Sequence, residues 1–469
     1  MGLEPPEFTP VTDETVKPAS HPATLLRPRP SVWQADGSDV AGSQFVNVLG
    51  LATYYLATLL FMYQDYLNIG AMKATDERIV ATAFGFLQYP DISLVLVIGY
   101  AVLFAPEFRA NLRSKSGVAF FVFLAAYSCL GVLMGNEIGM VRTDLRVWGW
   151  GIGGLAMFRI AMKMRRPTLH ILALCLLAGV MLYVSAVSIK NQMGIGQAME
   201  NVRVWDLNVF CYSGMMIPLL GLVLSLVTLR GVFSFIGAVL AFCLYFDGAV
   251  LIGATRSLAI GLFVVCLSAS VSLLFHRDEK QITDKISPRA FWIGLATVVG
   301  ALAVVATLLG FAFSGSTVLA NRFSDDQDVA SGTDRIVELQ DGLRQLGFFK
   351  GLTGGGLGCT FESIFDYRSI SFHITIFTFL LKFGVLPFAV IVVTLYLILP
   401  LKFLQAFLRP ATLSPSTRTA LLVVLPSVFG WVAILSTSGG YDMYYAIGIG
   451  MAAGVFAEIK AHGLTHLCR

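Results

Sequence analysis

Charged residues are scarce in this chain of 469 residues. Aspartate, glutamate, lysine and arginine make up 13% of it, whereas hydrophobic residues make up 56%. Soluble domains carry roughly 25% charged residues, so this chain has too few to cover itself with a water-facing surface. The composition excludes a soluble globular protein and indicates an integral membrane protein. The formal net charge of +4 is too small to indicate a nucleic-acid partner.

Paired cysteines and metal-binding motifs are also lacking. Only one of the seven cysteines, Cys359, falls in a long polar segment, and it has no cysteine partner there. We therefore expect no structural disulfide. The sequence has no HExxH motif and no cysteine–histidine cluster, so we expect neither a metal ion nor a cofactor. The acidic run at 325–328 is more typical of a solvated turn than of a cation site.

The first 43 residues lack the apolar run of a secretory signal peptide. They are rich in proline, threonine, aspartate and glutamate. We therefore expect residues 1–43 to form a disordered tail on the cytoplasmic side of the membrane.

Long apolar runs, in contrast, are abundant. Crossing a bilayer core takes about 20 apolar residues in a helix. Runs of this order occur at 44–64, 88–106, 117–134, 168–189, 207–229, 232–252, 258–275, 290–313, 373–399 and 418–436. Two shorter runs, at 147–161 and 444–459, fit spans or tilted, half-inserted or re-entrant segments. We predict an all-α polytopic membrane protein of about twelve transmembrane helices, in blocks at 44–313 and 373–469.

The distribution of lysine and arginine predicts the orientation of these spans. The basic residues collect in four short loops, at 109–115, 163–166, 277–289 and 402–418. With twelve spans, these loops and both termini fall on one side, and the positive-inside rule makes that side cytoplasmic. The polar segment 314–372 then faces the opposite side as one large loop. The turn at 253–257 and the segment 135–146 are expected on that outer side too.

The large loop 314–372 contains the pattern of an amphipathic helix. Its apolar residues recur at helical spacing, at Ile336, Leu339, Leu343 and Leu346. Ser331 or Thr333 is placed to cap this helix, which would put Arg335 in its first turn. The helix dipole disfavours a cation there, so a nearby anion would explain the arginine. An ordinary surface arginine is the alternative.

Arg256 is the most conspicuous charge in the membrane region. It lies between two apolar runs without a polar loop to hold it. An arginine at bilayer depth costs at least about 2.5–3.5 kcal/mol unless it snorkels, pairs or faces a cavity. It is either a snorkelling residue at a tight outer turn, paired with Asp247, or a functional cation.

A glycine-rich turn and a histidine follow the predicted loop helix. Glycines at 354–356 and 358 let backbone N–H groups approach a phosphate, although no Gly-Lys-Ser/Thr follows and a plain loop is favoured. His373 lies where the predicted span 373–399 begins. Imidazole accepts a proton near neutral pH, so His373 fits a general base for a sugar hydroxyl. A structural histidine at the membrane interface is the alternative.

Three short motifs resemble, in their order, those of the Wzy/WaaL superfamily of O-antigen polymerases and O-antigen ligases. They are Thr255-Arg256-Ser257, then Ser331-Gly332-Thr333-Asp334-Arg335, then the 354–358 turn followed by His373 and Leu381-Lys382-Phe383-Gly384-Val385. The resemblance covers roughly residues 232–400. The chain departs from the family pattern at Ile374, where asparagine is usual, and at Glu338, where many members have tryptophan.

The resemblance implies a GT-C-like enzyme of the bacterial inner membrane that transfers a glycan from undecaprenyl diphosphate on the periplasmic face. The transfer would be inverting and independent of metal. Arg256 and Arg335 would hold the diphosphate, and His373 would accept the proton of the attacking hydroxyl. A chain-length co-polymerase is the protein partner that it implies. Five further cations are weaker candidates for contacts with the diphosphate or an acidic glycan: Arg344, Lys350, Arg368, Arg142 and Arg146.

Three functions are compatible with the sequence. The first is a polymerase of lipid-linked repeat units, and the second is an O-antigen ligase that transfers the glycan to lipid A core. The shared motifs serve the shared donor, so they do not separate these two. The third is a transporter of a lipid-linked glycan, which twelve spans also suit. Transporters typically contain internal repeats, and the two halves of this chain show no convincing similarity.

Overall fold

A computed structural model of the chain describes most of the predicted spans. The described residues are 39–71, 88–164, 166–192, 207–227, 232–252, 256–275, 327–362, 368–369, 371–437 and 439–468. The predicted span 290–313 and nearly all of the predicted tail 1–43 lie outside them. Residues Val46–Arg469 form one compact unit, and the fold is that of this unit.

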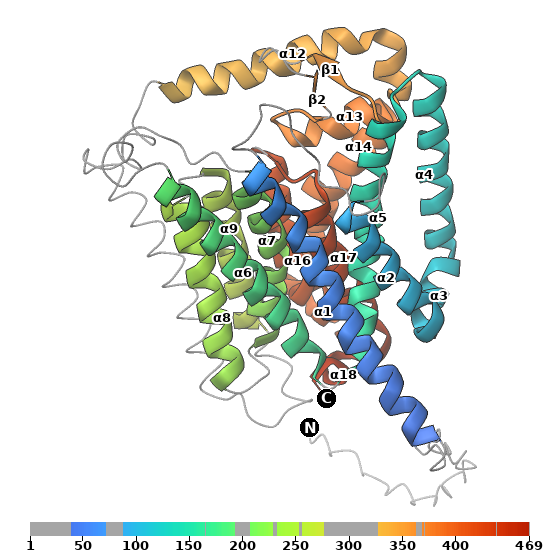
Figure 1. Ribbon diagram of the computed structural model, residues 1–469, viewed down its shortest axis with the longest axis vertical. Helices are drawn as coiled ribbons and strands as arrows, with labels where there is room; N and C mark the ends of the chain where they lie inside the picture. Colours follow the sequence, from blue (N-terminus) through green and yellow to red (C-terminus); the bar gives the residue numbers. More distant parts are fainter. Residues whose placement is uncertain are drawn as a thin grey trace, which may run out of the picture. The chain divides into compact units, whose positions relative to one another are not determined.

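Helices make up nearly all of the described chain (Figure 1). The helices before residue 276 are α1 (Asp39–Ala71), α2 (Tyr89–Phe104), α3 (Pro106–Arg113), α4 (Lys115–Leu133), α5 (Ile138–Lys163), α6 (Pro167–Gln192), α7 (Leu207–Val227), α8 (Val232–Tyr245), the π-helix η1 (Phe246–Ile252) and α9 (Arg256–Phe275). The later ones are α12 (Gln327–Thr353), η3 (Thr375–Phe377), α13 (Thr378–Phe383), α14 (Val385–Val393), η4 (Thr394–Ile398), α15 (Leu399–Leu408), η5 (Pro410–Thr412), α16 (Pro415–Leu435), α17 (Met443–His462) and α18 (Leu464–Cys468). Within the described ranges, the only sheet is a two-stranded antiparallel pair, β1 (Phe361–Glu362) with β2 (Arg368–Ser369), in which Phe361 lies opposite Ser369.

The apolar helices are those of an all-α, multi-pass membrane protein. Five segments are long and apolar enough to cross a bilayer: Gln44–Met62, Lys115–Leu133, Pro167–Val187, Val385–Leu408 and Pro415–Leu435. The pair α2 and α3, which is bent by 100° at Ala105, adds a sixth if it counts as one span. Every predicted span overlaps a described helix, apart from 290–313, which lies outside the described residues. The total of about twelve spans stays a prediction.

The two short apolar runs belong to full-length helices that pack on each other. Helix α5 has 26 residues and α17 has 20. A Cβ added at Gly154 would lie 2.1 Å from the carbonyl oxygen of Ile447, and one at Gly450 would lie 2.0 Å from that of Gly151. Small residues let two membrane helices approach this closely. The glycines therefore lower the mean hydropathy of both segments, and they also explain the close packing of the two helices.

Helices α4 and α14–α15 are the least buried of the membrane-length helices. In the most apolar stretch of each span, 11% of the residues of Lys115–Leu133 and 6% of those of Val385–Leu408 are buried, against 78% for Pro415–Leu435 in α16. In a membrane protein, apolar side chains left uncovered by protein face lipid. These two helices therefore have the largest lipid-facing surfaces among the candidate spans.

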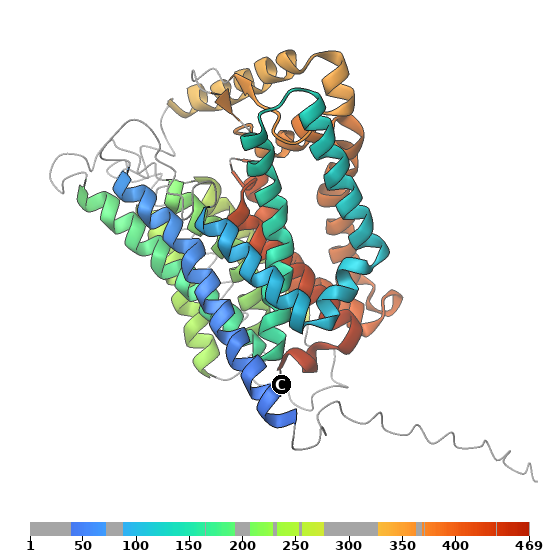
Figure 2. The same cartoon turned by 45° about the vertical axis from the view of Figure 1, so that its right-hand side comes forward.

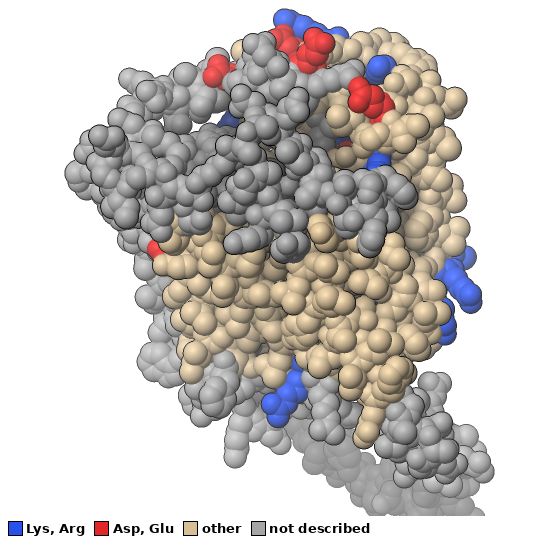
Figure 3. All heavy atoms as spheres, viewed as in Figure 1, with Lys and Arg blue, Asp and Glu red and all other residues tan. Residues whose placement is uncertain are grey.

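Helix α12 lies across one end of the helix bundle, as Figures 1 and 2 both show. On the face seen in Figure 3, acidic and basic side chains lie together at this end of the described protein. The described charged side chains at the opposite end of that face are basic. The described charged side chains of the large loop thus lie over one end of the bundle.

The beginning of α12 corrects one prediction. The helix starts at Gln327, so Arg335 lies in its third turn, and neither Ser331 nor Thr333 is its cap. The sequence places Asp328 in the first turn, where the helix dipole favours negative charge. The helix is also broken at Gly347, whose φ of 63° and ψ of 177° are not helical.

The membrane helix after the loop begins later than predicted. Gly384 has a φ of 77°, a conformation that favours glycine, and the long apolar helix starts only at Val385. The residues between His373 and Gly384 form the short helices η3 and α13 instead of the first turns of a span. His373 therefore lies in a separate segment, which is packed between α12 and the bundle.

Candidate functional site

An aromatic pair positions α12 over the segment that carries His373. The rings of Phe361 and Phe372 stack with their centroids 4.3 Å apart. A Cβ added at Gly342 would lie 2.3 Å from a ring carbon of Phe372, so glycine lets α12 rest directly on this ring. Glu338 lies four residues before Gly342, on the same face of the helix. This packing brings Glu338 to the residue that follows Phe372, which is His373.

The carboxylate of Glu338 holds His373 at two points. It accepts hydrogen bonds from the backbone N–H of His373 at 3.1 Å and from the ring atom Nδ1 at 2.7 Å. The Glu338 side chain is 1% exposed, whereas that of His373 is 21% exposed. A carboxylate can only accept, so this geometry puts a proton on Nδ1. In the neutral ring, Nε2 is then the basic atom.

Sequence reasoning missed this role of Glu338, which it noted only as a departure from the family pattern. The residue lies three positions after Arg335, so the two side chains share a helix face. An acidic residue on the same face as a candidate functional arginine was the available signal. Its burial against His373 depends on tertiary packing, which the pattern does not show.

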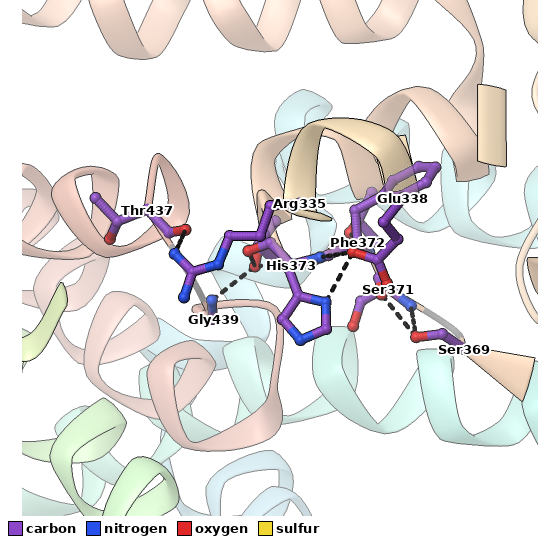
Figure 4. Close-up of polar contacts among 10 residues, drawn as sticks. Arg335, Glu338, Ser369, Ser371, Phe372, His373, Thr437 and Gly439 are labelled. Carbon is purple, nitrogen blue, oxygen red and sulfur yellow. Dashed lines mark hydrogen bonds and ion pairs between the residues drawn. The ribbon is translucent and has the colours of Figure 1, made fainter. Parts of the chain in front are cut away.

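Arg335 approaches the loop between α16 and α17. Its Nη1 donates a long hydrogen bond of 3.5 Å to the carbonyl oxygen of Thr437. The same loop contacts the His373 segment, because the backbone N–H of Gly439 donates to the hydroxyl of Thr375 at 2.8 Å. Figure 4 shows Arg335, Glu338 and His373 around this loop. The structure therefore brings Arg335 and His373 together.

The backbone of Arg256 lies at the same end of the bundle; its side chain is outside the described residues. Helix α9 begins at this residue and runs antiparallel to α16. A Cβ at Gly261 would lie 2.8 Å from the side chain of Ile434, near the end of α16. Arg256 precedes Gly261 by five positions, which is roughly 7 Å of helix in the direction of Thr437. The start of α9 is thus level with the loop that Arg335 contacts.

The glycine-rich turn is not a phosphate cradle. Its backbone N–H groups all donate to protein acceptors: Gly354 to Lys350 O, Gly355 to Leu381 O, Gly356 to Lys382 O, Leu357 to Tyr127 O, and Gly358 to the carboxylate of Asp144. Glycine is needed because three of its residues have φ between 75° and 81°. The turn is a structural joint between α12, α4, α5 and α13, as the plain-loop alternative requires.

A buried ion pair completes this joint. The Nζ of Lys382 lies 2.7 Å from Oδ2 of Asp144, and both side chains are fully buried. The same Nζ donates to the carbonyl oxygen of Cys359 at 2.8 Å. Lys382 therefore ties the end of the glycine turn to α5 and α13.

Arg142 and Arg146 both bind helix α2. Both contact Asp91 of α2, and Arg146 does so twice, with Nε–Oδ1 at 2.6 Å and Nη2–Oδ2 at 2.7 Å. They lie on the face of α5 that continues through Gly149, where an added Cβ would meet Leu94 of α2. Their positive charge is therefore partly neutralised on the α2 side of α5.

The other weak candidates lie around α12 and the hairpin. Arg344 is largely exposed and pairs with Asp341 at 3.2 Å. Lys350 is half-buried in the last turns of α12. Arg368 lies in β2, and its side chain is outside the described residues. Of the predicted cations with described side chains, only Arg335 reaches the loop that contacts the His373 segment.

Asp442 closes the loop beside the site by capping α17. Its Oδ1 accepts hydrogen bonds from the backbone N–H groups of Tyr444 at 2.8 Å and Tyr445 at 3.1 Å. Burial raises the pKa of the Asp442 carboxyl from 3.8 to about 7, and the hydrogen bond from Tyr445 opposes this rise. The folded protein thus holds this proton more tightly than the unfolded chain. The resulting stabilisation is fully present below pH 3.8 and is lost as the pH rises through about 7.

No protein-family model matches this chain, and no curated protein matches it.

Proposed function

We propose that this protein is a membrane glycosyltransferase that polymerises oligosaccharide repeat units. It transfers the glycan of one undecaprenyl-diphosphate-linked unit to a sugar hydroxyl of another, without a metal ion and with inversion. The observation that carries this proposal is the imidazole of His373, held by the buried Glu338 beside the guanidinium of Arg335. This arrangement lies at one end of a membrane helix bundle, where a lipid-linked substrate presents its head group.

In this proposal, His373 is the general base. Glu338 occupies Nδ1, so Nε2 takes the proton from the acceptor hydroxyl while the hydroxyl oxygen bonds to the anomeric carbon of the donor. The bond between that carbon and the diphosphate oxygen breaks at the same time, and the leaving group keeps the electron pair. The imidazolium that forms is stabilised by the neighbouring carboxylate of Glu338.

Arg335 is proposed to stabilise the charge of the departing diphosphate. In the described part of the chain, its contact is one long hydrogen bond to a backbone carbonyl, and no carboxylate pairs with it. A guanidinium group binds phosphate oxygens through two parallel N–H donors, which suits a diphosphate. Arg256 is assigned the same role, because its backbone lies at the level of the same loop.

We place the α12 end on the periplasmic side of a bacterial inner membrane, with both termini cytoplasmic. Helix α5 supports this placement: it starts beside the glycine turn and ends at Lys163, about 37 Å further along its axis. Lys163 belongs to one of the basic loops that the positive-inside rule places in the cytoplasm. A GT-C-like bundle of about twelve spans and a chain-length co-polymerase partner belong to the same proposal.

The test is a reconstituted polymerisation assay. Purified protein in lipid nanodiscs receives lipid-linked repeat units and no lipid A core, and the products are separated by chain length. We expect a ladder from the wild type and a loss of roughly 10²–10⁴-fold in rate for His373→Ala. Arg335→Ala should lose the ladder as well. Arg344→Ala is the matched control on the same helix and should keep it.

Other outcomes would identify the alternatives. Transfer that occurs only after lipid A core is added would identify a ligase with the same site. Translocation of the lipid-linked glycan that is equal in wild type and His373→Ala, without any polymer, would identify a transporter. Inactivation by a chelator, reversed by a divalent metal, would contradict the metal-free mechanism.

A further inference from the structure

The last turn of α12 exposes a group of large apolar side chains. Beyond the break at Gly347, Phe348 is 88% exposed, Phe349 is 62% exposed and Leu352 is 54% exposed. Exposed apolar residues that lie together, unlike isolated ones, mark an interaction surface. We call Phe348, Phe349 and Leu352 the apolar tip of α12.

The apolar tip lies at the level where two membrane helices leave the apolar core. A Cβ added at Gly384 would lie 2.4 Å from the carbonyl oxygen of Leu352, and the span Val385–Leu408 begins at the next residue. On the other side, Leu357 donates its N–H to the carbonyl oxygen of Tyr127, near the end of the span Lys115–Leu133. The chain that carries the tip is thus fixed at the boundary of both spans.

These two spans have the largest lipid-facing surfaces among the candidate spans. Their ends next to the tip expose Leu133 and Leu386, at 84% and 73%. Helix α12 contacts α14, which is the first part of the second span. The apolar tip therefore continues the exposed apolar surface of these two spans.

The break at Gly347 separates two kinds of helix surface. Before it, α12 carries charged residues, which include Arg335 and Glu338 of the site. After it, the tip has two aromatic rings and a leucine around Lys350, whose aliphatic stem can lie along apolar surface while its amine stays at the head groups. Apolar side chains flanked by a lysine are typical of segments that lie in the membrane interface.

We propose that Phe348, Phe349 and Leu352 insert into the head-group boundary of the leaflet at the α12 end. The bilayer then fixes the far end of the helix that carries Arg335 and Glu338. Lipid is favoured over a second protein because the tip is continuous with the lipid-facing surfaces of α4 and α14. This inference needs only a membrane protein and does not depend on glycosyl transfer.

The test is photo-crosslinking of the full-length protein in lipid nanodiscs. Phe348 is replaced by p-benzoylphenylalanine, and lipid adducts are measured by mass spectrometry after irradiation. Leu386, at the start of the span, is the lipid-facing control position, and Gln340, exposed on α12 before the break, is the water-facing one. We expect an adduct yield at 348 similar to that at 386 and roughly ten-fold above that at 340.

Two results would overturn the proposal. One is a yield at 348 as low as that at 340 while position 386 reacts with lipid. The other is crosslinking from 348 to a second copy of the chain instead of lipid. Neither readout measures polymerisation. A negative result here would therefore contradict the lipid contact of the tip and would not contradict the proposed enzyme activity.

Discussion

Two carboxylates at the α12 end of the protein each hold a basic side chain, in very different surroundings. Asp144 and Lys382 are fully buried, and every N–H of the adjoining glycine turn donates to the protein. Glu338 is equally buried, but its partner His373 is one-fifth exposed, and within the described residues the nearby Arg335 makes a long contact to a carbonyl. The first pair is enclosed by protein and joins segments, with Oδ2 of Asp144 bound both to Lys382 and to the backbone N–H of Gly358. The second orients a basic ring that remains accessible, which is what chemistry on a substrate requires.

Breaking the Asp144–Lys382 pair should give the largest effect on stability. Lys382→Met leaves the Asp144 carboxylate buried without its charge partner, and such losses cost about 3–5 kcal/mol. We expect a lower midpoint of unfolding in detergent and less folded protein by size-exclusion chromatography. Lys382→Met combined with Asp144→Leu should recover part of this loss, because no uncompensated charge is left. If Lys382→Met alone is as stable as the wild type, the ion pair does not stabilise the joint between the glycine turn, α5 and α13.

Changing Glu338 should lower the reaction rate without unfolding the protein. Glu338→Gln keeps the size of the side chain but removes the charge that stabilises the imidazolium of His373. We expect kcat to fall roughly 10²-fold, at the lower end of general-base effects, while KM for the lipid-linked unit stays the same. Glu362→Gln, at the exposed position of strand β1, is the control. An unchanged kcat for Glu338→Gln would reduce Glu338 to a packing residue.

The smallest effect is expected where α2 meets α5. Arg142 is the more exposed of the two arginines that bind Asp91, so Arg142→Ala should cost no more than about 1 kcal/mol of stability. Arg146→Ala should cost more, because this guanidinium makes two hydrogen bonds to Asp91 and is mostly buried. Both variants should polymerise normally. If either variant is folded but makes no ladder of polymer chain lengths, the diphosphate binds at α2 and α5 instead.

The sequence predicted an all-α membrane protein because crossing a bilayer demands long apolar runs, and five of its apolar helices are long enough to cross one. It underestimated α5 and α17, since their glycines lower the apolar signal while providing close packing. It extended the span after the loop to His373, because the break at Gly384 lies inside an uninterrupted apolar run. In each case, the missing information was how one helix packs on another.

For the candidate site, the motifs identified the cation and the imidazole but not what holds them. Arg335 and His373 were selected from residue type and order, and the structure brings them together. Glu338 was missed, because its burial against His373 depends on how Phe372 lies under Gly342. The pairing of Lys382 with Asp144 was equally invisible, since it joins α5 to a segment much later in the chain.

The glycine seam between α5 and α17 has a mechanical consequence. One helix cannot slide along the other, because their backbones are in close contact at Gly154 and Gly450. Neither contact involves a side chain that could rotate out of the way. A salt bridge joins the same two helices further along, where Arg159 of α5 lies 2.6 Å from Glu458 of α17. These two helices act as a rigid frame, so we expect any opening for substrates to lie between other elements of the bundle.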